Sequence, residues 1–368
     1  MDKNKTLRIL GTRGVPAQHG GFETFAEHLA LYLTRHDWNV TVYCQDEGDG
    51  AIFTEEWQGI ELIHVPIKNK GALGTILFDW KTTLHAARRQ DGILTLGYNT
   101  AIFCVLYRLL KLRNVINMDG LEWQREKWSL AARIWLYVNE RIGCLAGNHL
   151  IADHPEIQKH LATRVQPGKI TMIPYGANHI DSADQALLEP YGLHPREYAI
   201  VIARPEPENS ILEIVAGFSR RARGKKLVVL GNFDKANPEY RKQVFAAASA
   251  EVLFPGAVYD QPVVQALRYF ACLYIHGHQV GGTNPSLVEA LGAGMPILAH
   301  NNRYNHWVAG NDNHYFANAD ECAQSLDFLL ENAALLEQMR VKNRQRHLDC
   351  FTWEHILAQY EQVLSEQL

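Results

Sequence analysis

The chain alternates short apolar runs with glycine turns and amphipathic helical patterns, and this alternation constrains its fold more than any other feature. A helical pattern such as ETFAEHLALYLTRH (residues 23–36) lies between several of the runs. Because strands separated by helices are joined by crossovers, the pattern predicts an α/β protein with a parallel, doubly wound sheet. The predicted strands of the first half are LRILGT (7–12), NVTVYC (39–44), IELIHV (60–65), GILTLG (92–97), NVINM (114–118), HLIA (149–152) and ITMIP (170–174).

The alternation weakens after Gly176 and then restarts. Residues 177–197 are polar, contain two prolines and show no clean period, so we place a linker there. The second series of predicted strands is YAIVIAR (198–204), KLVVLGN (226–232), VLFPGAV (252–258), CLYIHG (272–277) and PILAHN (296–301).

A chain of 368 residues is too long for one ordinary core. We therefore expect two Rossmann-like domains, over residues 1–178 and 179–345, that face a central cleft. Ligands of such open sheets bind beyond the carboxyl ends of the strands. Residues 346–368 are expected to contain a helix that packs back on the first domain. Its predicted apolar positions are Ile356, Leu357, Tyr360, Val363 and Leu364.

Composition narrows the function classes. The hydrophobic content of 47% is that of a globular protein, and the net charge of -4 gives no basic field for nucleic acid. The six cysteines are widely spaced, which argues against a zinc knuckle or a disulfide framework. The N-terminus enters a strand-like run without a signal-peptide pattern, and no apolar run is long enough to span a bilayer. We expect a cytoplasmic protein.

The first predicted strand ends in a glycine-containing loop that is a candidate ligand loop. Gly11 and Gly14 follow the strand, and Gly20 and Gly21 open a helix. The spacing is not the dinucleotide pattern G-x-G-x-x-G, but a helix N-terminus favours an anion. The alternative is a long surface loop. Arg13 in this loop either contacts a phosphate or is simply solvated.

The second domain offers an arginine at the equivalent place. Arg204 follows the strand in AIVIARPEPENS and has the permanent charge and paired donors that suit a diphosphate. The alternative is a surface salt bridge with Glu206 or Glu208.

The stretch VGGTNPSLVEALGAG (280–294) predicts a short helix with Thr283 or Asn284 as cap, Pro285 first and Gly294 at its end. Glu289 lies one turn in and can accept from sugar hydroxyls in pairs. The alternative is an acid that only stabilises the helix dipole. The residues whose backbone amides or side chains could bind phosphate oxygens are Gly281, Gly282, Thr283, Asn284 and Ser286.

With these motifs in place, the whole chain resembles the GT-B glycosyltransferases of the large retaining family 4, and more closely their bacterial rhamnosyltransferase-type branch. The motifs that carry the resemblance are GTRGVPAQHGGFETFAEHLA, NMDGLEWQREKW, ADHPEIQKHL, IPYGA, ARPEPENS and GGTNPSLVEALGAGMPILA, which occur in the expected order. The resemblance implies an N-terminal acceptor domain and a C-terminal donor domain.

The resemblance also assigns residues. It implies that Gly20 and Gly21 face the donor phosphate, that Arg204 binds the diphosphate and that Glu289 binds the ribose. Two family positions differ: a glutamate would fall at Gly281 and a lysine at Asn209. Amides around Gly281–Thr283 are expected to replace the glutamate, with His278 as a further donor.

NMDGLEWQREKW supplies the candidate reacting carboxylates. Asp119 lies where the wider family often has an active-site histidine, so we expect it to be a sugar-binding or catalytic carboxylate. Glu122 is the second candidate for this role. The alternative is that Asp119-Gly120 is only a turn and Glu122 a capping acid. Asp153 and His154 are expected to cap the helix that starts at Pro155.

The sequence does not predict a metal or a cofactor. No D-x-D occurs, and the H-x-H of His276 and His278 has no acid or cysteine beside it. A basic and apolar pattern, Tyr107–Arg113, suggests contact with an anionic membrane surface; the alternative is a set of core aromatics with solvated charges. The residues that extend it are Arg125, Lys127, Trp128, Arg133, Trp135 and Arg141.

The function predicted from the sequence is transfer of a hexose or deoxyhexose from a nucleotide-diphospho-sugar to a saccharide or lipid-linked saccharide, in polysaccharide synthesis. The resemblance implies dTDP-rhamnose as donor and metal-independent transfer with retention. One alternative is an inactive sugar-nucleotide or polysaccharide-binding protein, favoured by the differences at Gly281 and Asn209. The other is an oxidoreductase or epimerase, which would need the absent dinucleotide pattern.

Overall fold

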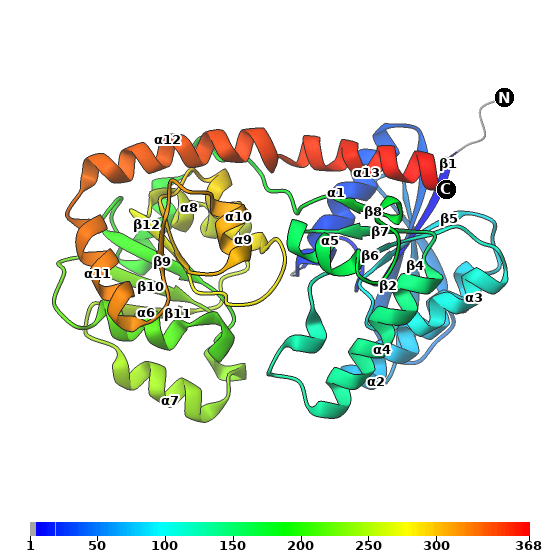
Figure 1. The fold of residues 1–368 in the computed structure, drawn as a ribbon, viewed down its shortest axis with the longest axis horizontal. Helices are drawn as coiled ribbons and strands as arrows, with labels where there is room; N and C mark the ends of the chain where they lie inside the picture. Colours follow the sequence, from blue (N-terminus) through cyan, green and yellow to red (C-terminus); the bar gives the residue numbers. More distant parts are fainter. Residues whose placement is uncertain (1–4, 19) are drawn as a thin grey trace. The chain divides into compact units, whose positions relative to one another are not determined.

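The computed structural model describes residues 5–18 and 20–368. Its internal contacts divide the chain into two compact parts. Unit 1 comprises Met1–Pro174 and Trp353–Leu368, and unit 2 comprises Tyr175–Thr352. Each unit is a sheet with helices packed on it (Figure 1).

Unit 1 contains an eight-stranded sheet in the order β3-β4-β2-β1-β5-β6-β7-β8. Neighbouring strands are parallel except β3 and β4, and Ile9 in the centre pairs with Val42 on one side and Leu94 on the other. The strands are β1 (Lys5–Leu10), β2 (Trp38–Glu47), β3 (Phe53–Trp57), β4 (Ile60–Ile67), β5 (Gly92–Leu96), β6 (Asn114–Asn117), β7 (His149–Ala152) and β8 (Ile170–Met172). The helices are α1 (Gly21–Arg35), α2 (Gly71–Ala86), α3 (Cys104–Leu109), α4 (Leu130–Ala146), α5 (Pro155–Leu161) and α13 (Trp353–Gln367).

Unit 2 contains a six-stranded parallel sheet in the order β11-β10-β9-β12-β13-β14. Its strands are β9 (Tyr198–Ile202), β10 (Lys226–Leu230), β11 (Val252–Gly256), β12 (Leu273–His276), β13 (Ile297–His300) and β14 (His314–Phe316). Its helices are α6 (Ile211–Phe218), α7 (Pro238–Ala247), α8 (Gln261–Phe270), α9 (Pro285–Gly292), α10 (Arg303–Ala309), α11 (Ala319–Leu330) and α12 (Ala333–Cys350).

Alternate residues of the unit 2 strands build two apolar cores, one on each face of the sheet. In β9, Tyr198 and Ile200 pack with Leu287 of α9, whereas Ala199 and Val201 pack with Ile214 of α6. Successive side chains of a strand point to opposite faces, so a strand that is apolar throughout requires a cover on both. This arrangement confirms the predicted doubly wound fold class.

The last helix, α13, packs in unit 1. The ring of Tyr360 lies 4.6 Å from that of Phe25, and its hydroxyl accepts a 2.8 Å hydrogen bond from Asn117. The contact boundary lies at Thr352/Trp353 rather than at residue 346, because α12 continues to Cys350 and buries Asn343 and His347 in unit 2. The first boundary lies at Pro174/Tyr175, four residues before the expected one.

Candidate functional site

The carboxyl ends of β9 and β12 form the switch point of the unit 2 sheet. The two strands are neighbours, and the strands that follow them lie on opposite sides of the pair. Open sheets bind ligands at such a point, because the loops that leave the two strands diverge there. Exposed Arg204 is the second residue after β9, and the loop after β12 begins at Gly277.

The two loops at the switch point are joined directly. The backbone N–H of Gln279 donates to the carbonyl of Glu208 at 2.9 Å, and its side chain donates to the hydroxyl of Ser210 at 2.9 Å. At Gly277 a Cβ atom would lie 2.1 Å from the carbonyl oxygen of Asn209, so only glycine fits. The loop that carries Arg204 therefore has a fixed position relative to the loop that leads to α9.

Asn209 helps to hold Arg204 in place. Its side chain is 1% exposed and donates a 2.8 Å hydrogen bond to the carbonyl of Arg204. A lysine, which the resemblance would place here, would lose this bond and bury a charge. The structure therefore gives Asn209 a contact with the loop backbone, and its predicted contact with the donor stays a prediction.

The N-terminus of α9 has the predicted cap. The side chain of Asn284 accepts from the backbone N–H of Ser286 at 3.1 Å and from its hydroxyl at 2.9 Å. The hydroxyl of Ser286 also accepts from Tyr274 at 2.9 Å, so this hydroxyl is already engaged, and the predicted contact of Ser286 with a phosphate stays a prediction. Among the described residues, the backbone N–H groups of Gly281 and Gly282 have no hydrogen-bond acceptor. Thr283 is buried.

Glu289 is paired with Arg268, an arginine that was not predicted from the sequence. Arg268 of α8 is 5% exposed, and its guanidinium donates to the carboxylate of Glu289, whose side chain is 33% exposed. A carboxylate accepts up to about four hydrogen bonds, so the pairing leaves acceptor sites for sugar hydroxyls. In the sequence, Arg268 could have been recognised from its spacing: it lies four residues after Val264, on the same face of α8 as the buried apolar residues.

Two stacked histidines close the end of β12. The rings of His276 and His278 lie 4.4 Å apart, and His276 is 1% exposed. Burial, with His278 and His300 nearby, lowers the pKa of His276 well below its ordinary value. His276 is therefore a neutral imidazole at physiological pH. The described residues contain no group of three or more His, Cys, Asp or Glu with the geometry of a metal site.

In unit 1 the glycines of the loop after β1 lie in two different settings: Gly11 packs against a neighbouring strand, and Gly20 and Gly21 lie at the start of α1. At Gly11, with φ +83°, a Cβ would lie 2.1 Å from the carbonyl oxygen of Leu96, so glycine is required here for close packing of β1 against the end of β5. Gly20 and Gly21 open α1, and Gly20 has φ +116°. Arg13 is exposed at the mouth of the same loop.

Asp119 lies directly beyond β6 in a constrained turn. It has φ +52°, and its backbone N–H donates to the side chain of Asn117 at 3.0 Å. Burial and, to a lesser degree, the charge of Glu122 raise the pKa of Asp119 to about 6. Glu122 forms a 2.8 Å ion pair with Arg125 and accepts from the indole of Trp128 at 3.3 Å, so its carboxylate is already engaged. Of the two predicted acids, Asp119 has the environment of a proton-exchanging group.

His154 caps α5 as predicted. Its Nδ1 accepts from the backbone N–H of Glu156 at 3.0 Å, and the residue is completely buried. A buried imidazole that caps a helix has a structural role.

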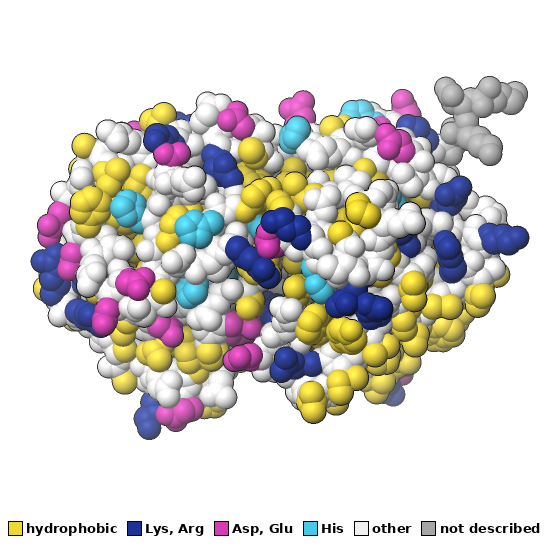
Figure 2. Space-filling model, in the orientation of Figure 1, with side chains coloured by type: hydrophobic (Ala, Val, Ile, Leu, Met, Phe, Trp, Pro, Cys, Tyr) yellow, Lys and Arg dark blue, Asp and Glu magenta, His cyan; other side chains and the backbone are white. Residues whose placement is uncertain are grey.

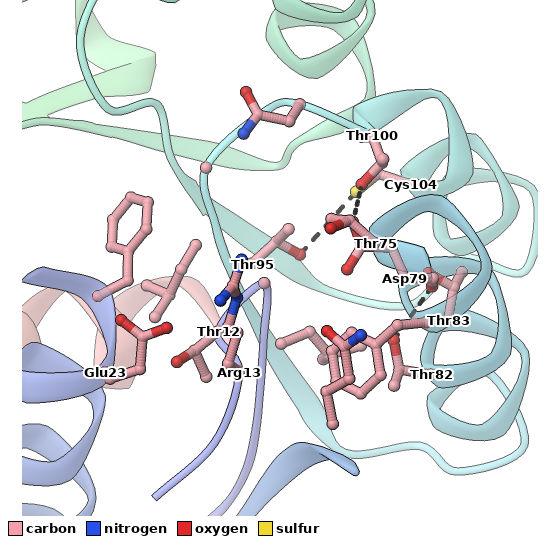
Figure 3. A pocket seen from close by; sticks show the side chains of 18 of the residues that line it. Thr12, Arg13, Glu23, Thr75, Asp79, Thr82, Thr83, Thr95, Thr100 and Cys104 are labelled. Carbon is pink, nitrogen blue, oxygen red and sulfur yellow. Dashed lines mark hydrogen bonds between the residues drawn. The ribbon is translucent and has the colours of Figure 1, made fainter. Parts of the chain in front are cut away.

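A cavity of about 540 Å³ in unit 1 was not predicted. It lies at the carboxyl ends of β1 and β5, between the start of α1 and the side of α2, and Arg13 and Gly21 line it (Figure 3). Its polar lining is dominated by hydroxyl groups, from Thr12, Thr75, Thr82, Thr83, Thr95 and Thr100. Neither Asp119 nor Glu122 lines it.

Asp79 is the notable acid of this cavity. The hydroxyl of Thr100 donates to one of its carboxylate oxygens at 2.7 Å. Burial raises the pKa of Asp79 to about 6, although the hydrogen bond from Thr100 by itself lowers this pKa. Its other oxygen has no hydrogen-bond partner among the described residues. The available signal was that Asp79 is the only acid in the α2 sequence GALGTILFDWKTTLHA.

Two families match parts of the sequence. Residues 214–362 match the family described as "Glycosyl transferase-like", and residues 4–178 match one described as "Domain of unknown function (DUF1972)". No match was found among curated proteins.

Solved structures match the whole chain. Sucrose-phosphate synthase from Thermosynechococcus elongatus is 16% identical, with 98% of each chain covered and a TM-score of 0.78. HepE from Anabaena, solved with UDP and glucose, is 15% identical, with 99% of this chain and 100% of that chain covered and a TM-score of 0.77. A UDP-forming α,α-trehalose-phosphate synthase from Burkholderia xenovorans, solved with glucose-6-phosphate, is 13% identical, with 98% and 100% covered and a TM-score of 0.73.

The chain has the GT-B fold. This fold was predicted, and residues 214–362 match a glycosyl transferase-like family. The assignment to family 4 and to its rhamnosyltransferase-type branch stays a prediction.

Proposed function

We propose that the protein transfers a sugar from a nucleotide-diphospho-sugar, held by unit 2, to a saccharide acceptor, held by unit 1. The observation that carries the proposal is the switch point of unit 2. The site there contains exposed Arg204, the unpaired amides of Gly281 and Gly282, and Glu289 of α9. The two loops that carry the arginine and the glycines are joined by hydrogen bonds, and the second loop leads directly into α9.

The donor contacts follow from the chemistry of these groups. Arg204 supplies a permanent charge to the diphosphate, and the glycine amides with the α9 dipole supply neutral donors. Glu289, oriented by Arg268, accepts from the ribose hydroxyls. Leaving-group charge is met by these fixed donors, so we propose transfer without a bound metal.

The acceptor is proposed to enter the threonine-lined cavity of unit 1. Its lining contains two acids, Asp79 and Glu23, and one Lys or Arg, which is Arg13. Hydroxyl groups and a carboxylate with a free oxygen match the hydroxyls of a neutral sugar, whereas a sugar phosphate would require more positive charge. We therefore propose an uncharged acceptor sugar ring, unlike the glucose-6-phosphate bound to the trehalose-phosphate synthase.

Finer features of the reaction rest on the sequence resemblance. We propose dTDP-rhamnose as donor, retention of configuration, and a role in polysaccharide synthesis with the acceptor sugar on a lipid carrier at the cytoplasmic face of a membrane. Asp119, whose raised pKa is that of a group able to exchange protons near neutral pH, is the proposed carboxylate at the transferred sugar.

A product assay tests the proposal. The protein is incubated in EDTA with dTDP-rhamnose, UDP-glucose or GDP-mannose, with and without neutral alkyl glycosides or glucose-6-phosphate, and nucleoside diphosphate release is measured. We expect one donor to be consumed, faster with a neutral glycoside than with the phosphate. Failure with every donor would reject the transferase, and preference for the phosphate would reject the proposed acceptor class alone.

A further inference from the structure

Unit 1 carries an extended apolar surface. Of the twenty-one exposed large hydrophobic side chains described, fourteen lie between residues 73 and 145. Three are largely exposed: Leu109 at 74%, Leu130 at 73% and Leu145 at 70%. Soluble proteins rarely leave large contiguous apolar patches in water, so a concentration of exposed apolar side chains marks a candidate binding surface.

The apolar side chains form stripes along three helices. In α4, Leu130, Ile134 and Val138 recur every fourth residue on the exposed side, while Leu136 and Cys144 are buried on the other. A helix that is apolar on both sides needs a second apolar environment beyond its own core. In α2 the exposed stripe is Leu73, Trp80 and Leu84, and in α3 it is Val105 and Leu109.

The three helices are linked through the short 3-10 helix η1 (Ala101–Phe103). The ring of Trp80 in α2 lies 5.1 Å from that of Phe103, and the backbone N–H of Ile102 donates to Asn139 of α4 at 2.9 Å. Because α3 begins directly after η1 and packs against α4, the three helices lie side by side. Figure 2 shows hydrophobic side chains gathered over α2, α3 and α4, the helices at the lower right of Figure 1, with Lys and Arg among them.

The charges on this surface are almost all positive. Between residues 73 and 145, all of which the structure describes, Glu126 is the only exposed acid. The exposed bases of the same range are Lys81, Arg88, Arg89, Arg108, Lys111, Arg113, Lys127 and Arg141. The whole chain carries a net charge of -4, so the positive charge is local to this surface.

Apolar stripes surrounded by lysine and arginine match a bilayer of anionic lipid, where apolar side chains enter the headgroup boundary and cations remain at the phosphates. We propose that the exposed face of α2, α3 and α4 binds the surface of a membrane that contains anionic lipids. No described helix is long and apolar enough to cross a membrane. The inference extends the proposed function, since a lipid-linked acceptor would be presented there.

The structure also refines the predicted membrane residues. Trp128 and Trp135 are each 39% exposed and stay in the set. Tyr107 is buried at 1% exposure and belongs to the core, and Arg125 is paired with Glu122. The strongest candidates are the exposed leucines, which the sequence pattern did not distinguish from core residues.

Vesicle flotation tests the proposal without donor or acceptor, so its result is independent of the transferase assay. The full-length protein is mixed with vesicles of phosphatidylcholine alone or with phosphatidylglycerol. We expect flotation with the anionic vesicles and a decrease with added salt. A test variant replaces the three most exposed leucines with serine, and a matched control replaces Phe328, Val341 and Leu348 of unit 2, which are 53%, 64% and 45% exposed.

The leucine variant should lose at least tenfold in vesicle affinity, while the control keeps it. A second variant, Arg113→Glu with Arg141→Glu, should lose affinity for anionic vesicles by at least about fivefold for each charge. The matched control, Lys235→Glu with Lys242→Glu, should keep the wild-type affinity. A thermal melt of each variant checks that it is folded. No flotation of the wild-type protein, or equal losses in the controls, would overturn the proposal. So would a stable wild-type dimer in sedimentation analysis that the leucine variant dissociates, because the surface would then be a protein interface.

Discussion

Replacing Asp79, the half-buried acid of the unit 1 cavity, should stabilise the protein. The pKa of Asp79 is raised from 3.8 to about 6 by burial, so the folded state holds its proton more tightly than the unfolded state. Between these two pH values the folded state binds more protons, and stability from this group falls as pH rises. Above pH 6 the cost reaches about 3 kcal/mol, from roughly two pKa units at about 1.4 kcal/mol each.

The variant Asp79→Asn has no charge to bury and can still accept from Thr100. We expect it to unfold at a temperature at least about 3 °C higher than wild type at pH 7.5, since 1 kcal/mol moves the midpoint of a domain of this size by about 2–4 °C. The gain should be small at pH 4, grow up to about pH 6 and then stay constant.

Calorimetry across this pH range measures the effect. Asp49→Asn is the matched control, because Asp49 is an exposed acid in a surface ion pair and should show no such gain. A gain that is the same at pH 4 and pH 7.5, or a loss of stability at pH 7.5, would show that burial of a charged Asp79 does not destabilise the folded state. If the cavity holds the acceptor, Asp79→Asn should also raise the acceptor KM and leave nucleotide affinity unchanged.

Three further variants test the donor side and the loop packing. Arg204→Ala should lower transfer at least tenfold with little change in melting temperature, as measured by nucleotide release; a wild-type rate would exclude the diphosphate contact. Arg268→Gln leaves Glu289 without its partner, so nucleotide affinity measured by calorimetry should fall, and recovery in Arg268→Lys would separate positioning from misfolding. Gly11→Ala should lower the melting temperature strongly, because a Cβ would lie 2.1 Å from a backbone oxygen; an unchanged melt would contradict the strand packing.

The sequence predicted the strands whose residues are apolar on both faces. All twelve predicted runs are strands, because a run such as 198–202 has no stable place other than the middle of a covered sheet. It missed β3 and β14. FTEEW in β3 is largely exposed and lies at the sheet edge, and β14 has only three residues, so neither has a distinctive pattern.

Local sequence signals also predicted the helix caps, whereas the side-chain pairs of the two sites could not be predicted from the sequence. Asn284 and His154 lie within two residues of the amides they accept from. The contacts of Arg268 with Glu289 and of Thr100 with Asp79 each join residues 21 apart on different elements. Such pairs depend on how helices pack on the sheet, and a single sequence shows each member only as an isolated polar residue.

The central claim, a nucleotide-sugar site in unit 2, is tested most directly by titrating dTDP, UDP, GDP and NAD into the metal-free protein by calorimetry, with Glu289→Gln as comparison. We expect one nucleoside diphosphate to bind the wild-type protein and raise its melting temperature, and the variant to bind it at least tenfold more weakly. Binding of NAD alone, or of no diphosphate, would contradict it.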